Sequence, residues 1–210
     1  MNQKSGQNSL GLDNCFGDEA NPIVLFKKWF NAAEKSEIND PNALSLATST
    51  ANGIPSVRMV LLKGYSDKGF IFYTNFNSKK GNDLKKNPNA SMCFHWKSLR
   101  RQIRVSGKVN VVDDKTADDY YNSRAYRSRI GAWASSQSSI MKNRNELIEK
   151  FNEFEKKYPD KNNVPRPPHW SGWCLQPQQI EFWLEIENRI HERLNYKKEN
   201  NNWVREILYP

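Results

Sequence analysis

Three polar side chains spaced four residues apart, Tyr120, Arg124 and Ser128, form the first group that could do chemistry. On one continuous helix each step of four residues advances about 40°, so the spacing predicts a single stripe that carries a phenol, a guanidinium and a hydroxyl. Such a stripe could hold a phosphate dianion, because each hydrogen bond to a charged group contributes roughly 1.5 to 3 kcal/mol. The same spacing also fits an ordinary polar helix face, and this alternative stays open.

A second candidate group, Arg189, His191 and Arg193, alternates along the chain with other residues. If this segment is a strand, all three side chains project to the same side. Clustered cations repel one another unless an anion or an electron-rich ligand lies among them. The pattern therefore predicts either a ligand-binding face or an exposed sheet face, and Trp183 shortly before is either a core aromatic or a stacking platform.

A basic residue stands at each end of the apolar segment 58–63. A regular strand would place Arg58 on one face and Lys63 on the other, where they would serve different ligands, unless a bulge re-aims one of them. Burying an unpaired charge costs several kcal/mol, so Arg58 beside apolar neighbours favours a functional role.

Other common devices are absent from the sequence. It contains no Gly-x-Gly-x-x-Gly fingerprint and no P-loop, so a bound phosphate would be held mainly by side chains. The three histidines are scattered, and no metal-ligand spacing connects them. We therefore expect no metal site.

The charge balance is strongly basic. Thirty-two lysines and arginines against 23 acidic residues give a net charge of +9, so the surface field favours anions. Charge alone fits either nucleic acid or a phosphorylated small molecule. The mixed basic and aromatic stretch 27–30 is better explained as a helix with one core face than as a platform for bases. We expect no nucleic-acid partner.

No segment of the sequence is apolar enough to cross a membrane. The longest apolar runs have four residues, whereas a spanning helix needs about 20. Residues 1–14 contain no apolar stretch of signal-peptide type, and the three cysteines are an odd number without metal-type spacing. We expect a reduced, cytoplasmic protein with no membrane partner.

Residues 1–20 are rich in Asn, Ser and Gly, which predicts a flexible arm, and the apolar pattern that starts at residue 21 predicts a single domain over residues 21–210. Asn21 and Pro22 indicate the start of a helix that ends before Asp40. We expect further helices over 78–86, 114–133 and 139–157, and strands over 44–50, 57–63, 70–74, 90–96, 102–112, 172–183 and 188–208. Five consecutive strands with short turns predict a mainly β fold with flanking helices, in the form of an antiparallel barrel.

Six ordered blocks resemble the pyridoxamine 5'-phosphate oxidase family, namely 58–63, 72–75, 101–102, 120–133, 137–138 and 181–193. The resemblance is collinear from about Asn21 to Pro210. It implies an FMN-binding split barrel of antiparallel Greek-key type, assembled as a homodimer with two flavins at the subunit interface. It also implies a C-terminal segment, about 170–210, that serves dimerisation and the active site.

The resemblance assigns roles to individual positions of this chain. The FMN phosphate and ribityl end would be held by Arg58, Lys79, Lys80, Gln137 and Ser138. The flavin would be lined by Met59, Val60, Leu61, Leu62, Lys63, Tyr73, Thr74, Gln102, Trp183 and Arg193. The substrate phosphate would be gripped by Lys63, Tyr120, Arg124 and Ser128. The catalytic positions would be Arg189 and His191, over the pyridine ring, and Asp40, near the reacting carbon.

The implied activity is oxidation of pyridoxine 5'-phosphate or pyridoxamine 5'-phosphate to pyridoxal 5'-phosphate. Hydride would pass to flavin N5, and O2 would then be reduced to H2O2. One departure is Lys79, which stands where an arginine is common and replaces a bidentate donor with a point charge. The alternatives are a split-barrel flavoprotein oxidoreductase with another substrate and a non-catalytic module that binds flavin or pyridoxal phosphate.

Overall fold

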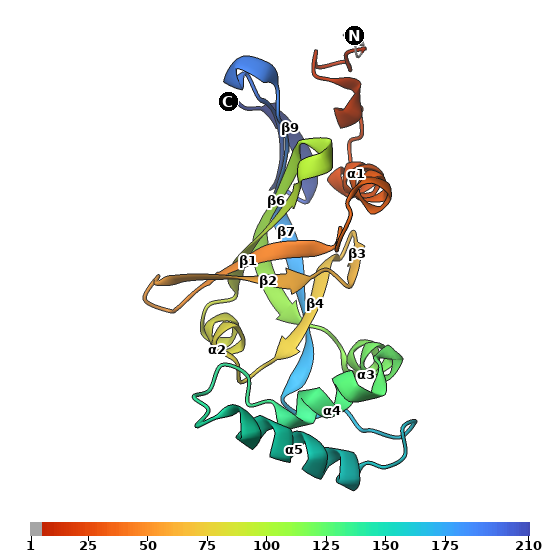
Figure 1. Cartoon of the computed structure of the whole chain (residues 1–210). Coiled ribbons are helices and arrows are strands. Elements are labelled where there is room, and N and C mark those ends of the chain that lie inside the picture. Colours follow the sequence, from red (N-terminus) through yellow and green to blue (C-terminus); the bar gives the residue numbers. More distant parts are fainter. Residues whose placement is uncertain (1–5) are drawn as a thin grey trace.

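The computed structural model describes residues 6–210 and folds them around a nine-stranded antiparallel sheet (Figure 1). The strands are β1 Ala43–Ser49, β2 Pro55–Leu61, β3 Gly64–Ser66, β4 Gly69–Asn75, β5 Asn89–Trp96, β6 Arg101–Val111, β7 Trp170–Leu184, β8 Glu192–Glu199 and β9 Asn202–Ile207. The helices are α1 Pro22–Ser36, α2 Lys79–Lys86, α3 Asp114–Ser123, α4 Tyr126–Ala134 and α5 Arg144–Lys157. Short 3-10 turns are η1 Asn14–Phe16, η2 Lys97–Leu99 and η3 Glu187–Arg189. The predicted mainly β fold with flanking helices is confirmed.

The strands follow the order β2-β1-β5-β6-β7-β4-β3, with β8 beside β7 and β9 beside β8. Strand β7 has two partners on one edge, because its first part pairs with β4 and its last part pairs with β8. Trp183 lies 13 positions after Trp170 on this strand, which corresponds to about 40 Å along an extended chain. Groups beside Trp170 and groups beside Trp183 therefore lie toward opposite ends of the long sheet in one copy of the chain (Figure 1).

Helix α1 covers the apolar face of the sheet. The side-chain oxygen of Asn21 accepts a hydrogen bond from the Ile23 backbone and caps the helix, as the sequence predicts. Phe26 makes edge-on contacts with Phe70 and Phe94, with ring centroids 4.8 and 5.4 Å apart. These rings are fully buried, so apolar burial fixes the helix against the sheet.

The β1–β2 hairpin turns at Asn52 and Gly53, between the predicted strands 44–50 and 57–63. Gly53 has a φ of 81°, a left-handed conformation that glycine adopts without strain. Hydrogen bonds between Thr50 and Ile54 close the turn. The hairpin carries Arg58 on β2.

Residues 6–20 pack along the domain. Phe16 is fully buried and contacts Trp29, whose indole donates a hydrogen bond to the Cys15 carbonyl oxygen. The division into an arm at 1–20 and a domain at 21–210 stays a prediction, and residues 1–5 of that arm lie outside the described residues.

The continuous helix predicted over 114–133 is wrong. Helix α3 ends at Ser123 and α4 begins at Tyr126, because Arg124 and Ala125 have extended ψ values of 148° and 142°. The Arg124 guanidinium packs over the ring of Trp170, 4.8 Å from its centroid, and this tertiary contact lies at the break between the helices. Tyr120, Arg124 and Ser128 therefore belong to a helix, a connector and a second helix, and the prediction of one helical stripe is wrong.

The strand predicted over 188–208 is wrong at its start. Asn188 and Arg189 have left-handed φ values of 58° and 64°, and they form the turn η3 before β8 begins at Glu192. Hydrogen bonds from the Ile190 amide to the Glu187 carbonyl oxygen and from the Ile186 amide to His191 Nδ1 hold this turn. The prediction that Arg189, His191 and Arg193 project from one strand is therefore wrong.

Candidate functional site

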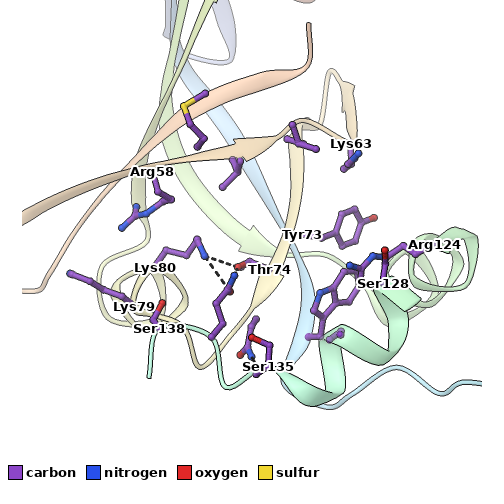
Figure 2. A pocket seen from close by; sticks show the side chains of 18 of the residues that line it. Arg58, Lys63, Tyr73, Thr74, Lys79, Lys80, Arg124, Ser128, Ser135 and Ser138 are labelled. Carbon is purple, nitrogen blue, oxygen red and sulfur yellow. Dashed lines mark hydrogen bonds between the residues drawn. The ribbon is translucent and has the colours of Figure 1, made fainter. Parts of the chain in front are cut away.

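A cavity of about 1010 Å³ lies between β2, β4, α2 and the α3–α4 segment (Figure 2). Its volume reaches the upper end of the range for small-molecule sites, so two small ligands can share it. The predicted site residues on its walls are Arg58, Met59, Val60, Leu61, Lys63, Tyr73, Thr74, Lys79, Lys80, Tyr120, Arg124, Ser128, Gln137 and Ser138. Leu62 is instead buried in the core.

Arg58 and Lys63 both line this cavity, although a regular strand would separate them. Strand β2 ends at Leu61, and the Lys63 amide then donates a hydrogen bond to the Ile71 carbonyl oxygen on β4. Because the regular pairing ends here, both cations reach the same cavity, where they lie at opposite ends (Figure 2).

One end of the cavity carries three cations, Arg58, Lys79 and Lys80 (Figure 2). The carboxylate of Asp83 neutralises part of their charge. Lys80 is buried and donates hydrogen bonds to Thr74 Oγ1 at 3.0 Å and Gln137 Oε1 at 3.3 Å. Burial, and secondly the nearby Arg58, lower the pKa of Lys80. Loss of water around these cations strengthens their attraction for an incoming anion.

The first turn of α2 presents the two lysines to this end of the cavity. Ser78 caps the helix by accepting a hydrogen bond from the Gly81 backbone. A Cβ atom at Gly81 would come within 2.4 Å of the Phe76 carbonyl oxygen, so only glycine fits this approach. This close packing fixes the backbone of the first helical turn, from which the side chains of Lys79 and Lys80 extend.

The other end of the cavity is built from cations and aromatic rings (Figure 2). Tyr73 and Tyr120 stack with ring centroids 4.0 Å apart, and Tyr73 also stacks on Trp170 at 5.3 Å. Arg124 lies over Trp170, and Lys63 lies 5.9 Å from the centroid of the Tyr120 ring. This arrangement holds two cations beside the Ser128 hydroxyl, and among residues 6–210 no Asp or Glu lines the cavity.

Arg124 keeps hydrogen-bonding capacity for a ligand. Its Nη1 atom is buried and has no hydrogen-bond partner within residues 6–210. Burial lowers the pKa of Arg124, and the neighbouring Tyr120 and Tyr121 act in the opposite direction. A desolvated guanidinium with a free donor is suited to bind an anion.

Trp170 supports Arg124 and was missed by the sequence reasoning. It is the first residue of β7, and only His169 separates it from the proline-rich segment that ends at Pro168. An aromatic residue at the point where an extended crossing segment enters a strand is the signal that could have found it.

A second group of predicted residues lies at the β6–β8 end of the sheet. Gln102, Trp183 and Arg193 are direct neighbours across β6, β7 and β8, so their side chains share one face. His191 packs on Trp183 with ring centroids 4.7 Å apart. None of these four residues lines the large cavity.

Glu181 fixes the position of Arg193. Arg193 donates from Nε to Glu181 Oε1 at 2.9 Å and from Nη2 to Oε2 at 3.1 Å, and Arg104 also pairs with this carboxylate. Burial acts to raise the pKa of Glu181, but the hydrogen bonds from Arg193 and Arg104 outweigh it and the net pKa is lowered. The charged carboxylate therefore holds a planar, oriented guanidinium.

Arg189 and Asp40 are exposed and also lie outside the cavity. Asp40 adopts a φ of 42° in the turn before β1, where its carbonyl oxygen accepts a hydrogen bond from the Ala43 amide. Within one copy of the chain, the structure thus brings together the predicted phosphate ligands but not the predicted catalytic residues.

Comparison with known proteins decides the family. A family model described as pyridoxamine 5'-phosphate oxidase matches residues 30–183, and one described as the pyridoxine 5'-phosphate oxidase C-terminal dimerisation region matches residues 170–210. The chain belongs to the pyridoxamine 5'-phosphate oxidase family. The resemblance seen in the sequence is confirmed.

Relatives in this family match nearly the whole chain. A pyridoxine/pyridoxamine 5'-phosphate oxidase of Pelagibacter ubique is 61% identical, with 100% of both chains covered. One of Agrobacterium fabrum is 49% identical over 93% of this chain and 95% of its own length.

Solved structures of the family share the fold. PhzG from Burkholderia lata, determined with tetrahydrophenazine-1-carboxylic acid, is 30% identical and has a TM-score of 0.88 over 98% of this chain and all of its own. An FMN-binding protein of Nostoc punctiforme related to pyridoxamine 5'-phosphate oxidase is 20% identical, with a TM-score of 0.72 over 92% of this chain and all of its own. The predicted split-barrel fold is confirmed.

Proposed function

We propose that the protein is an FMN-dependent oxidase that converts pyridoxine 5'-phosphate or pyridoxamine 5'-phosphate to pyridoxal 5'-phosphate. The observation that carries this proposal is one cavity of about 1010 Å³ with two separate cationic groups. A pair of phosphorylated ligands brings about four negative charges, and each cationic group can receive one phosphate. Membership of the family supports the same assignment.

The residues present fit FMN at the end formed by β2 and α2. Arg58, Lys79 and Lys80 would hold its phosphate, with Gln137 and Ser138 beside them. The ring system would be lined by Met59, Val60, Leu61, Lys63, Tyr73 and Thr74. When bound, FMN supplies the redox chemistry, accepting a hydride at N5 and returning the electron pair to O2 with two protons to give H2O2.

The other end fits the phosphate of the substrate. Arg124 and Lys63 would supply the positive charge, and the hydroxyls of Tyr120 and Ser128 would donate hydrogen bonds. Burial, and secondly the neighbouring Tyr120, raise the pKa of Tyr73 to about 12, so its phenol stays protonated at neutral pH. Anchoring both phosphates positions the two rings face to face, which raises the effective concentration of the reacting atoms.

A second copy of the chain would complete the site. Arg189 and His191 would align the pyridine ring and its phenolate from that copy, with Asp40 near the reacting carbon as a third proposed active-site group. Gln102, Trp183 and Arg193 would line the flavin, where an oriented guanidinium stabilises negative charge that develops on the ring. In one copy, Gln102, Trp183 and Arg193 lie at the other end of the 15-residue strand β7 from Trp170.

The surface of the structure supports pairing of two copies. Val57, Met59 and Leu61 on β2 are 67%, 63% and 39% exposed, and they lie beside the cavity. Exposed apolar side chains on one strand are typical of an interface. The match of residues 170–210 to a dimerisation region supports a homodimer.

The activity is tested by anaerobic bleaching. Purified protein should be yellow, and each B6 vitamer 5'-phosphate should bleach the flavin band in the absence of oxygen. Readmitted air should restore the band with one H2O2 formed per turnover. Colourless protein, or a flavin that neither vitamer bleaches, contradicts the proposal.

A shared site is tested by mixing two inactive variants. Arg124→Leu and Arg189→Leu homodimers should each have little turnover, and Arg189→Leu should retain its FMN. After subunit exchange, half of the dimers are mixed and each contains one intact site, so about one quarter of wild-type activity should return. No recovery in dimers shown to have exchanged contradicts a site built from two copies.

A second candidate substrate is an aromatic acid without phosphate, because PhzG in complex with tetrahydrophenazine-1-carboxylic acid has a very similar fold. The cationic group around Arg124 favours the phosphorylated substrate. Comparing bleaching rates with the vitamer phosphates and with their unphosphorylated forms separates the two: a rate that is indifferent to the phosphate favours the second candidate.

We further propose that the reaction takes place in the cytoplasm. Cys15, Cys93 and Cys174 are all free thiols, which fits a reducing compartment. No helix within residues 6–210 is long and apolar enough to span a membrane.

A further inference from the structure

Asp83 is a buried carboxylate at the α2 end of the cavity, where Arg58, Lys79 and Lys80 lie. The proposed function gives it no role. It lies on α2, one turn after Lys79, and its side chain is 7% exposed. A negative charge beside a phosphate site opposes phosphate binding, and burying it costs free energy unless it is paired. Its position therefore needs a physical reason.

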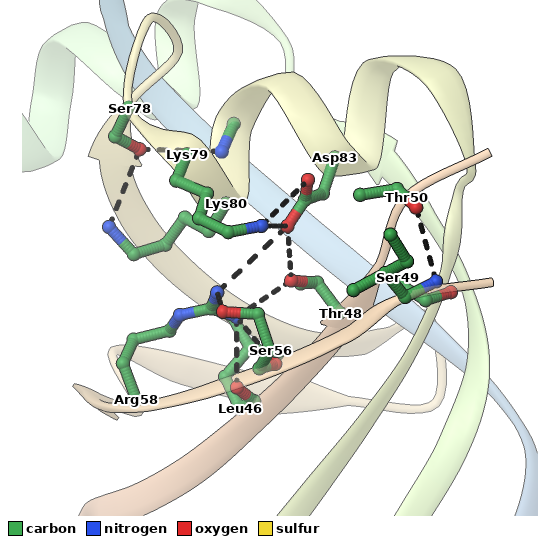
Figure 3. A network of polar contacts seen from close by, with 12 residues as sticks. Leu46, Thr48, Ser49, Thr50, Ser56, Arg58, Ser78, Lys79, Lys80 and Asp83 are labelled. Atoms are coloured by element: carbon green, nitrogen blue, oxygen red, sulfur yellow. Dashed lines mark hydrogen bonds and ion pairs between the residues drawn. The ribbon is translucent and has the colours of Figure 1, made fainter. Parts of the chain in front are cut away.

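Asp83 joins two of the three cations of this end (Figure 3). Lys79 Nζ lies 3.3 and 3.4 Å from its two carboxylate oxygens, and Arg58 Nη2 lies 4.0 Å from Oδ2. Thr48 connects the group further, because its hydroxyl donates to Asp83 Oδ2 at 2.9 Å and accepts from Arg58 Nη1 at 2.8 Å. Thr48 thereby uses its hydroxyl proton toward Asp83 and one lone pair toward Arg58.

The network also fixes the direction of Arg58. Its Nη1 atom donates to the Leu46 and Ser56 carbonyl oxygens at 3.1 and 3.2 Å, and Nη2 donates to Ser56 Oγ at 2.7 Å. Burial lowers the pKa of Arg58, and Asp83 acts against this by raising it. The carboxylate thus favours the charged form of the guanidinium.

The charges of the cluster match one phosphate group. Arg58, Lys79 and Lys80 carry three positive charges, and Asp83 reduces the sum to two. A phosphate monoester carries about 1.5 to 2 negative charges at pH 7. With Asp83 the filled site is close to neutral, whereas without it the site keeps an excess of positive charge.

We propose that Asp83 is the resident counterion of the cofactor-phosphate site. It holds Arg58 and Lys79 in place beside Lys80 when no phosphate is bound, and it limits how strongly the site binds a phosphate. This inference rests on the proposed binding of FMN at this end of the cavity. Asp83 is a positioning residue, since it acts through Arg58 and Lys79.

The test is Asp83→Asn in the full chain freed of FMN, because asparagine keeps the shape and an acceptor for Thr48. At low ionic strength the Tm of the FMN-free variant should fall by about 3 °C or more relative to wild type. Inorganic phosphate should raise the Tm of the variant more than that of wild type. Added salt should reduce both differences, because it screens the repulsion among the cations.

Affinity gives a second, independent readout. The dissociation constant for FMN should fall by roughly threefold to tenfold in Asp83→Asn, since a repelling charge has been removed. Affinity for riboflavin, which lacks the phosphate, should not change. An unchanged or weaker affinity for FMN overturns the inference.

Two variants control for simple loss of structure. The double variant Lys79→Gln/Asp83→Asn removes one charge of each sign and should recover most of the lost Tm. Glu146→Gln breaks a comparable i,i+4 ion pair, the one between Glu146 and Lys150 on α5. This change should not alter the response to phosphate. A Tm loss that the double variant does not recover contradicts a counterion role, even if Asp83→Asn alone fails to fold.

The inference and the proposed function fail in different ways. If wild-type protein binds riboflavin as tightly as FMN, the assignment of this end to a cofactor phosphate is wrong. If wild-type protein prefers FMN and Asp83→Asn changes neither Tm nor that preference, only the role of Asp83 is wrong.

Discussion

The two ends of the cavity hold their cations by different means. At the α2 end, Arg58 and Lys79 share the buried carboxylate of Asp83. At the other end, Arg124 forms no ion pair with a carboxylate within residues 6–210 and instead lies over the ring of Trp170. A counterion stabilises an empty site but competes with a ligand, whereas an aromatic face supports a cation and leaves its donors free.

This difference fits a resident cofactor at one end and an exchangeable substrate at the other. Under the proposed function, the α2 end would remain folded before FMN binds, and paired charges suit that state. The Arg124 end would bind and release a substrate phosphate in every turnover. A guanidinium with an unused buried donor gives the arriving anion an immediate partner.

The strongest test of the comparison is Arg124→Leu. Loss of about two charge-assisted hydrogen bonds, each worth roughly 1.5 to 3 kcal/mol, should lower kcat/KM for pyridoxine 5'-phosphate by about 10² to 10⁴-fold. The flavin content of the purified variant should equal that of wild type. Steady-state kinetics and flavin absorbance measure the two quantities, and a parallel loss of both would show that the ends are not independent.

A smaller effect is expected from Arg58→Gln at the opposite end. The dissociation constant for FMN should rise by about 10 to 100-fold, because one charge-assisted contact is lost while Lys79 and Lys80 remain. At saturating FMN, KM for the substrate should stay near the wild-type value. Equal losses of affinity for FMN and riboflavin would indicate that Arg58 supports the hairpin rather than the phosphate.

The smallest effect is expected from Trp170→Leu. Loss of the aromatic face under Arg124 should raise KM for pyridoxine 5'-phosphate about fivefold, in keeping with a cation–π contact of roughly 1 kcal/mol. Trp170→Phe should restore most of the affinity, and binding of FMN should be unaffected by either change. An effect on FMN as large as that on the substrate would blur the distinction between the ends.

Local signals in the sequence were sufficient for most of the fold. Asn21 and Pro22 fix the start of α1 through a cap and a preset φ, and Gly53 fixes the hairpin turn. Features that depend on distant residues were not predictable in this way. The break at Arg124 coincides with packing against Trp170, which lies 46 positions later in the chain.

The candidate site shows the same division between local and distant effects. The family resemblance predicted most residues that line the cavity, but it did not indicate Trp170 or Asp83. The alternation of residue types along 188–193 could not reveal the turn at Arg189. Asn188 and Arg189 both have positive φ values, so their side chains do not alternate between two faces as they would in a strand. Nor could alternation show that β7 is long enough to place the two halves of the predicted site at opposite ends of one strand.

Trp170 also gives the protein an optical reporter. It is one of seven tryptophans in the chain and the one that lines the cavity, next to two tyrosine rings. Its emission overlaps the absorption of flavins, so a flavin bound in this cavity should quench it. Subtracting the signal of Trp170→Phe isolates this quenching, and a titration can then follow occupancy without any attached dye.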